Sequence, residues 1–409
     1  MPIKFPPPTY SNIPGSWAHS TVSKRLPEIA AQVIEENQYP DEINEALTRL
    51  QEEINHHPIR PLLDQGAPDQ GAWEEYVQPY IGQSWLEVPW FFVEHYFYRR
   101  IMEAVRYFQL GQDPFGYQKA QGLEKSREEI RYLSNYFQKR IGDEEHIEGA
   151  IREGLYYSLW GNQADLSLWP AGSDTSPKHA SLKSLDDHLL ANDMRQIINI
   201  VSRGTQALAR VDLLLDNAGF ELVSDLALVD VLLGFGLVER VFLHAKTHPT
   251  FVSDVIPLDV VGAIDFLRDQ SDPATLSFGK RLEMYVLSGR LITTSHLFWN
   301  SPLPMWKLPD DLEEEWKGSS LVISKGDANY RRLLGNLEWE YTLPFEQVVD
   351  YLPVPLGAIR TLKSELALGM DATQIQRAAQ QDPDWMVDGR WGVIHFARGR
   401  IGWQSDTCG

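Results

Sequence analysis

Beyond about residue 205 the sequence alternates short apolar runs with segments of helical periodicity, and this alternation limits the possible folds more than any other feature. Each run is short enough for a buried strand and ends in a polar loop. Successive strands separated by helices need crossover connections, which predict a mostly parallel sheet with helices on both faces. The expected fold is a three-layer α/β/α core. The candidate strands are residues 211–215, 241–243, 290–294, 321–323 and 391–396.

The first half of the chain shows helical periodicity instead. Residues 24–38 and 41–54 place apolar side chains near helical spacing, and residues 90–110 are rich in aromatic residues. We expect one long helix over 90–110, with its aromatic side chains in the core, and a further helix over 116–141. The predicted domains are an N-terminal all-helical domain, residues 1–155, and the α/β/α domain, residues 156–409.

The charge balance argues against a nucleic acid as the partner. The 409 residues include 37 Lys and Arg against 57 Asp and Glu, a net charge of −20, whereas nucleic-acid binding needs a basic face. A small anionic ligand remains compatible, because a few cations or one metal ion can reverse the sign of the potential locally. The sequence predicts no particular oligomeric state.

Other features predict a cytoplasmic protein that does not bind membranes. The single cysteine, Cys408, cannot form an intramolecular disulfide, which fits a reducing compartment. The N-terminus lacks the apolar segment of a secretory signal. The most apolar stretch, residues 227–238, is short and includes Asp230, so we expect a core helix there rather than a membrane span.

Polar residues gather in loops that follow the candidate strands, where an open parallel sheet binds its ligands. Asp216 and Asn217 follow the first strand, and their oxygens suit Mg²⁺ or Mn²⁺. On this pair alone, an Asx turn that caps the next helix is the simpler explanation. After the next strand, Asp254 could complete a metal site and Lys246 could meet a phosphate. The alternative is that Asp254 caps a turn and Lys246 lies in solvent.

A third loop, residues 324–332, follows a strand with a glycine turn and a helix start, which is a natural cradle for an anion. It lacks the pattern of a nucleotide P-loop. No G-x-S-x-G elbow and no strand-linked G-x-G-x-x-G occur, and one cysteine excludes a thiolate-rich zinc site. These absences argue against a serine hydrolase, and we expect no nucleotide cofactor.

Six short segments, taken in order, form a set that spans nearly the whole chain. They are residues 24–27 (KRLP), 159–167 (LWGNQADLS), 216–221 (DNAGFE), 251–254 (FVSD), 325–331 (KGDANYR) and 360–363 (RTLK). Each segment is short, but the ordered set is specific, and it resembles the damage-control phosphatase family, formerly a domain of unknown function. The resemblance is strongest to the subfamily with an R-T-x-K signature, which includes proteins that carry an acidic-residue methyltransferase name.

The resemblance implies metal-dependent removal of phosphate from sugar phosphates and related metabolites, on an α/β/α core with an N-terminal helical lobe. It implies one divalent metal ion (Mn²⁺, Co²⁺, Ni²⁺ or Mg²⁺) held by Asp216, Asn217 and Asp254. With Asp327, these are the candidate catalytic residues. The candidate substrate-binding residues are Arg25, Asn162, Glu221, Lys246, Asp327, Asn329, Arg331 and Lys363. The chain departs from the family pattern at Gln163, Ala164 and Thr250, which bears on substrate preference.

The leading hypothesis is a phosphatase acting on a small phosphorylated metabolite, such as fructose 1-phosphate or fructose 6-phosphate. Phosphate monoesters are inert, so the protein must stabilise charge on the phosphoryl oxygens and place an attacking group in line. Lys363 and Arg25 would share that charge, and Asp327 would handle protons or fix substrate hydroxyls. The attacking group is either metal-activated water or an aspartate. The alternatives are an S-adenosylmethionine-dependent protein-glutamate O-methyltransferase and a non-catalytic binding protein.

Overall fold

The structure is a computed structural model that describes residues 4–141, 144–161, 186–202 and 208–402. Within these residues a seven-stranded sheet has the order β1-β7-β6-β5-β2-β3-β4. All neighbouring strands are parallel except β6 and β7, which confirms the mostly parallel sheet. The strands are β1 (Leu189–Asn192), β2 (Leu208–Leu214), β3 (Val238–Ala245), β4 (Leu291–Ser295), β5 (Leu321–Lys325), β6 (Leu356–Thr361) and β7 (Gly392–Ala397).

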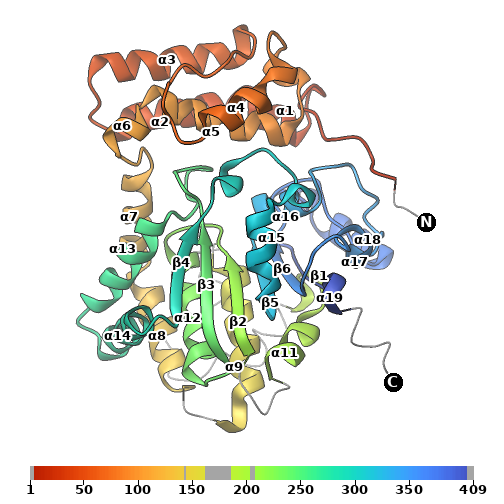
Figure 1. The fold of residues 1–409 in the computed structure, drawn as a ribbon. Helices are drawn as coiled ribbons and strands as arrows, with labels where there is room; N and C mark the ends of the chain where they lie inside the picture. Colours follow the sequence, from red (N-terminus) through yellow and green to blue (C-terminus); the bar gives the residue numbers. More distant parts are fainter. Residues whose placement is uncertain (1–3, 142–143, 162–185, 203–207, 403–409) are drawn as a thin grey trace.

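Helices cover both faces of the sheet and form the expected three layers (Figure 1). On one face lie α8 (Arg127–Gln138), α9 (Ile147–Trp160), α11 (Met194–Ser202), α12 (Phe220–Gly234), α13 (Pro257–Arg268) and α14 (Pro273–Leu287). The other face is covered by η5 (Leu297–Asn300), η6 (Met305–Lys307), α15 (Asp310–Lys317), α16 (Asp327–Leu333), α17 (Phe345–Val348) and α18 (Ala372–Gln381). The short α19 (Gly399–Gly402) ends the described chain.

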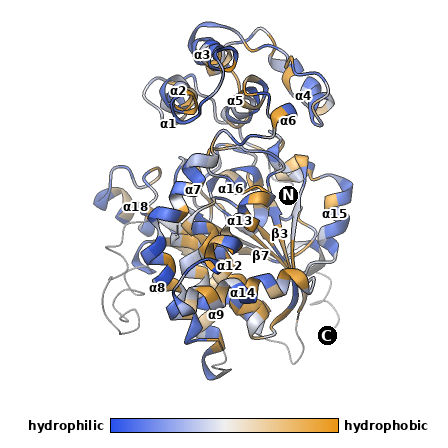
Figure 2. Ribbon diagram, turned by 90° about the vertical axis from the view of Figure 1, so that its left-hand side faces the viewer, coloured by the Kyte–Doolittle hydropathy of each residue, from blue (hydrophilic) through white to orange (hydrophobic). Residues whose placement is uncertain are grey.

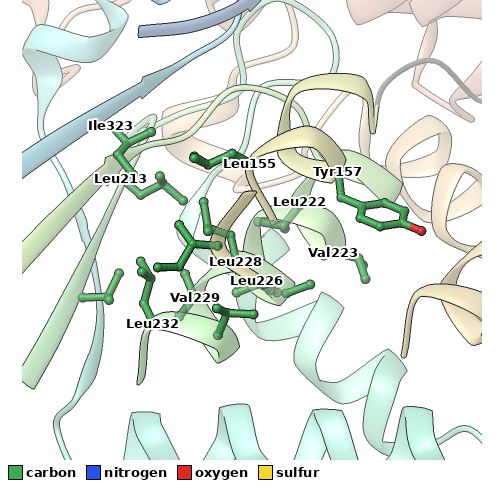
Figure 3. Packing of buried hydrophobic residues seen from close by; sticks show 14 of the residues in the cluster. Leu155, Tyr157, Leu213, Leu222, Val223, Leu226, Leu228, Val229, Leu232 and Ile323 are labelled. Atoms are coloured by element: carbon green, nitrogen blue, oxygen red, sulfur yellow. The ribbon is translucent and has the colours of Figure 1, made fainter. Parts of the chain in front are cut away.

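The buried helix α12 is the centre of the first layer. Figure 3 shows Leu213 and Ile323 from the strands meeting leucine and valine side chains of α12, with Leu155 from α9 beside them. Because α12 is buried nearly all round, its sequence is apolar on every side rather than on one stripe. Figure 2 shows how hydropathy is distributed over the molecule: the strands inside are hydrophobic, and outer helices such as α8 carry hydrophilic residues.

A separate group of helices lies above the carboxyl ends of the parallel strands, and we call it the cap (Figure 1). It has its own hydrophobic cluster, which includes Phe92, Tyr96 and Phe97, so these aromatic residues lie in the core as expected. Its elements are α1 (Trp17–Ser20), the π-helical turn η1 (Thr21–Arg25), α2 (Leu26–Glu36), α3 (Asp41–His56), α4 (Gln70–Val77), η2 (Gln78–Tyr80), η3 (Trp85–Glu87), α5 (Trp90–Ala104) and α6 (Tyr107–Leu110).

The chain passes from the cap to the sheet layers through α7 (Gly116–Lys125), and the short η4 (Glu144–His146) precedes α9. Phe115 belongs to the hydrophobic cluster of the cap, whereas α8 and α9 pack in the same cluster as the sheet. The division after residue 155 stays a prediction. On packing, we propose that the cap ends near residue 115.

The N-terminal segment ties the cap to the sheet layers on the side opposite α7. Tyr10 forms a β-bridge with Pro89 at the start of α5, and Pro8 forms one with Leu337 after α16. The ring of Phe5 stacks on Trp306 with a centroid distance of 4.9 Å. We call residues 4–10 the N-terminal strap.

Several elements differ from those expected. The predicted helix over 90–110 ends at Ala104, because Arg106 adopts the left-handed conformation with φ of 56°. The helix over 116–141 is two helices that meet at Ser126. Strands β1 and β6 are not among the predicted strands, and the stretch 227–238 is helical only to Gly234, after which β3 begins at Val238. None of the helices in the described ranges combines the length and apolar character of a membrane span.

Candidate functional site

The ends of β2, β3, β5 and β6 lie at one edge of the sheet, and their following loops meet beneath the cap. After β2 the chain adds β3 and β4 on one side, and β5 then pairs on the other side of β2. This reversal is the switch point at which open α/β sheets bind ligands. A pocket of about 330 Å³ opens here, and its polar lining from the sheet side is Asp216, Asn217, Ser253, Asp254, Asp327, Arg331 and Lys363.

Backbone pairing brings Asn217 next to Asp254. The two residues form an isolated antiparallel bridge, in which Val255 N donates to Asp216 O at 2.9 Å and Ala218 N donates to Ser253 O at 2.7 Å. The hydroxyl of Ser253 donates to Oδ1 of Asn217 at 2.5 Å. The loops after β2 and β3 are therefore locked together, so the three predicted metal ligands lie in one place.

The two carboxyl groups of this cluster are poorly compensated by local cations. Burial, together with the negative charges of Glu221 and Asp254, raises the pKa of Asp216 well above its ordinary value. Burial raises the pKa of Asp254 to about 6 even though the ammonium group of Lys246 lies 3.5 Å away. Such crowded carboxylates beside an amide oxygen fit a hard divalent cation, which would relieve their repulsion.

A close backbone approach leaves room for Asp216. Gly326 follows β5 with φ of 83°, and a Cβ atom built there would lie 1.9 Å from Cγ of Asp216. Only glycine is compatible with both this backbone conformation and this contact. The predicted glycine turn after β5 therefore leaves the space that the carboxylate of Asp216 occupies.

The same turn places Asp327 at the start of α16. Its Oδ1 accepts hydrogen bonds from Nε of Arg360 at 2.8 Å and from the Ser364 hydroxyl at 3.0 Å. Although burial opposes ionisation, the guanidinium groups of Arg360 and Arg331 hold the pKa of Asp327 below its ordinary value. Asp327 is therefore an ionised hydrogen-bond acceptor in the pocket wall.

Two cations line the pocket without a partner. Arg25, from the cap, is exposed, and Lys363, after β6, is half-buried. Neither side chain forms a hydrogen bond or ion pair with another residue in the described part of the chain, whereas Arg331 pairs with Glu94 at 2.6 Å. An anion that enters the pocket finds these two charges available.

Other predicted residues lie behind the pocket. Glu221 accepts from Nδ2 of Asn217 at 2.9 Å and from Lys325 at 3.1 Å, so it holds the amide from below. Lys246 is buried, donates to the carbonyl oxygen of Trp299 at 2.6 Å and does not line the pocket.

Two further candidates remain, and only one of them lies in the described part of the chain. Asn329 is buried and donates to the backbone oxygens of Leu215 and Lys325, each at 2.9 Å. Asn162 lies outside the described residues.

Apart from Arg25, sequence reasoning missed the residues that line the pocket from the cap. Trp90, Glu94 and Tyr98 line it from α5, and Trp17 and Thr21 line it from the start of the cap. The available signal was a buried carboxylate on an otherwise aromatic helix face, at a spacing of four residues from Trp90 and Tyr98.

A second acidic group has metal-like spacing but is already paired with a guanidinium group. Ligand atoms of Asp212, His244 and Glu315 lie within 4.8 Å of one another. The guanidinium of Arg210 donates to Asp212 at 2.7 Å and to Glu315 at 2.9 Å. Because a guanidinium group already binds both carboxylates, this cluster is an ion-pair network. It fits a metal ion less well than the cluster of Asp216, Asn217 and Asp254 does.

The doubly wound sheet, the acidic pocket at its switch point and the helical cap define a capped α/β protein that binds a small ligand at the carboxyl edge of the sheet. The model of the damage-control phosphatase ARMT1-like domain matches residues 21–377. The chain therefore belongs to the damage-control phosphatase family, as the ordered motifs indicated.

Similar proteins cover nearly the whole chain. "Damage-control phosphatase ARMT1" of Danio rerio is 35% identical over 96% of this chain and 97% of its own length. The protein of the same name from Homo sapiens is 32% identical over 93% of this chain and 96% of its own length. A solved DUF89 family protein from Pyrococcus horikoshii aligns with a TM-score of 0.46 and 14% identity, over 84% of this chain and 91% of that chain.

Proposed function

We propose that this protein is a divalent-metal-dependent phosphatase that hydrolyses phosphate monoesters of small metabolites, with sugar phosphates such as fructose 1-phosphate or fructose 6-phosphate as substrates. Family membership supports the phosphatase class. The observation that supports the proposal most is the meeting of Asp216, Asn217 and Asp254 with the unpaired cations Arg25 and Lys363 in one pocket.

Asp216, Asn217 and Asp254 would hold the metal ion. When bound, a divalent cation supplies stabilisation of the charge that develops on the phosphoryl oxygens. Glu221 fixes the amide group of Asn217, because its second oxygen is held by Lys325. The network therefore orients the amide before any ligand enters.

The remaining pocket residues act on the substrate directly. Lys363 and Arg25 bind the phosphate group and balance its charge from opposite walls. Arg331 also lines the pocket; its guanidinium stacks on Trp90 at 3.8 Å, and its charge is balanced by the carboxylate of Glu94. Asp327 accepts a hydrogen bond from the substrate, since it is held ionised by Arg360.

The cap shields the pocket from bulk solvent. Trp17, Leu26, Ile29 and Trp90 give the cap side of the pocket an apolar surface. A drier pocket strengthens the attraction between the cations and the phosphate. The cap also holds the phosphate group near the acidic cluster. In-line displacement requires that the reacting groups are held close together in this way.

The test is release of inorganic phosphate from a panel of sugar phosphates, with Mn²⁺, Co²⁺, Ni²⁺ or Mg²⁺ supplied in turn. Asp216→Asn should lower kcat by about 10²- to 10³-fold, because loss of a key electrostatic group costs that much. The control is Asp265→Asn, an exposed carboxylate on α13 that should leave activity unchanged.

Phosphate release that survives both EDTA and Asp216→Asn would contradict the proposed metal dependence. Tight binding of S-adenosylmethionine in calorimetry, without phosphate release from any substrate, would favour the methyltransferase alternative instead.

A further inference from the structure

The cap helix α5 presents a polar residue to the pocket between two aromatic ones. Trp90, Glu94 and Tyr98 are spaced four residues apart, so they share one face of the helix, and all three line the pocket. They face the acidic cluster and Lys363 across the pocket. A ligand whose phosphate lies at the sheet side therefore extends its other end towards this face.

Glu94 is almost fully buried, with 6% of its surface exposed, yet only one of its carboxyl oxygens is engaged. Its Oε2 lies 2.6 Å from Nη2 of Arg331. Burial raises the pKa of Glu94, and the guanidinium of Arg331 opposes this rise. No hydrogen bond joins Oε1 to any residue in the described part of the chain. One carboxylate oxygen is thus left for a ligand in the pocket.

The guanidinium of Arg331 is fixed without using that oxygen. Its Nε donates to Oδ1 of Asn336 at 2.8 Å, and its plane lies 3.8 Å from the ring centre of Trp90. Because three contacts hold Arg331, it cannot turn freely to accept a second phosphate at the cap side. Glu94 and Arg331 together form an ion pair with no net charge. Oε1 of Glu94 is the atom of this pair that can still accept a hydrogen bond.

We propose that Glu94 is a specificity-determining residue, which accepts hydrogen bonds from hydroxyl groups at the non-phosphate end of the substrate and disfavours a second phosphate there. This inference rests on the proposed function. Held against the guanidinium of Arg331, the carboxylate of Glu94 offers an acceptor and no donor, so its free oxygen matches a hydroxyl group and makes no hydrogen bond with the acceptor oxygens of a phosphate. The substrate class is then a monophosphate of a polyhydroxylated molecule rather than a bisphosphate.

The experiment compares kcat/KM for three phosphate monoesters: fructose 6-phosphate, fructose 1,6-bisphosphate and the hydroxyl-free p-nitrophenyl phosphate. Glu94→Gln removes the charge and keeps the size of the side chain. The ratio of kcat/KM for fructose 6-phosphate over the bisphosphate should fall about tenfold or more, mainly through KM. The value for p-nitrophenyl phosphate should stay within about threefold of wild type.

A purely structural role for Glu94 gives a different pattern. Asn336→Gly serves as the control, since it loosens Arg331 from outside the pocket and tolerates the φ of 52° at this position. That variant should lower kcat/KM for all three substrates alike. If Glu94→Gln behaves as Asn336→Gly does, or leaves the ratio unchanged, the inference is wrong.

Failure of the proposed function has its own signature. In that case the wild-type protein releases no phosphate from any of the three compounds with any of the four metals, and the inference falls with it. Wild-type activity combined with an unchanged ratio overturns the role of Glu94 alone.

Discussion

At the scale of single residues, the position of Asp216 depends on a glycine that is distant in the sequence. Gly326 has φ of 83° and ψ of 175°, a conformation that is essentially reserved for glycine. The carboxylate of Asp216 occupies the space in which any side chain at 326 would begin. The geometry of the acidic cluster is thus set partly from β5.

We predict that Gly326→Ala lowers kcat/KM for phosphate release by about 100-fold or more, because it displaces Asp216. The strained backbone should also cost about 1–3 kcal/mol of unfolding free energy. Gly236→Ala is the matched control, since Gly236 has φ of 67° but a Cβ atom there would meet no atom within 4 Å. The control should lose stability but keep activity, and equal activity in both variants would contradict the clash.

The sequence predicts candidate ligands better than it predicts the direction of their side chains. Asp216, Asp254 and Asp327 follow strands of one sheet edge, so their approach in space could be inferred from topology. Lys246 and Asn329 occupy equivalent loops, yet neither side chain lines the pocket. Asn329 donates to backbone oxygens, and Lys246 donates to the backbone oxygen of Trp299 and lies behind Asp254, 3.5 Å from its carboxylate. Position after a strand does not fix the direction of a side chain, because loop conformation decides it.

At the scale of elements, a π-helical turn positions part of the cap side of the pocket. Residues 17–36 form a continuous helical segment in which η1 contains a wider turn, with Leu26 N bonded to the carbonyl oxygen of Thr21. The wide turn brings Thr21 and Arg25 to the same pocket. Such turns arise from one extra residue in an α-helix and are frequent at functional sites.

Deletion of Ser23 should convert this turn into an α-helix and rotate Arg25 by about 100° relative to Trp17. We expect KM for a sugar phosphate to rise about tenfold or more, while the far-ultraviolet circular dichroism spectrum stays helical. Ser23→Ala, which removes only the hydroxyl bonded to His19 O, should keep the wild-type KM. An unchanged KM after the deletion would show that Arg25 does not bind phosphate.

The elements that the sequence failed to predict have identifiable causes. Strand β6 contains Gly357 and directly follows Pro355, a composition typical of a loop, and only its pairing with β5 and β7 makes it a strand. The long aromatic helix is predicted to reach residue 110, because no glycine or proline occurs within it before Gly111. The left-handed Arg106 ends it instead, a conformation that a local pattern does not reveal.

At the scale of the whole molecule, three hydrophobic clusters divide the fold into two sheet faces and a cap. The pocket lies where the cap meets the sheet layers, so ligand binding links separately packed parts. A ligand that binds only the folded state raises its stability by mass action. Metal binding is therefore measurable as thermal stability without any substrate.

We predict that Mn²⁺ at about 100 times its Kd stabilises the protein by about 2.7 kcal/mol, a rise in Tm of about 3 °C. Asp254→Asn should abolish this rise. Asp212→Asn removes a carboxylate from the other acidic group, which is paired with Arg210. This variant should keep the rise in Tm. If calorimetry instead shows that Asp212→Asn abolishes the rise in Tm and Asp254→Asn keeps it, the metal site is formed by Asp212, His244 and Glu315.

The N-terminal strap means that the cap is anchored at both of its ends. Thr9 donates to Asn336 O and accepts from Trp90 N, while α7 fastens the other end to the body. A part held at two opposite points cannot swing outward about a single pivot. We therefore expect ligands to enter and leave the pocket beside the exposed Arg25, while the cap stays in contact with the sheet layers.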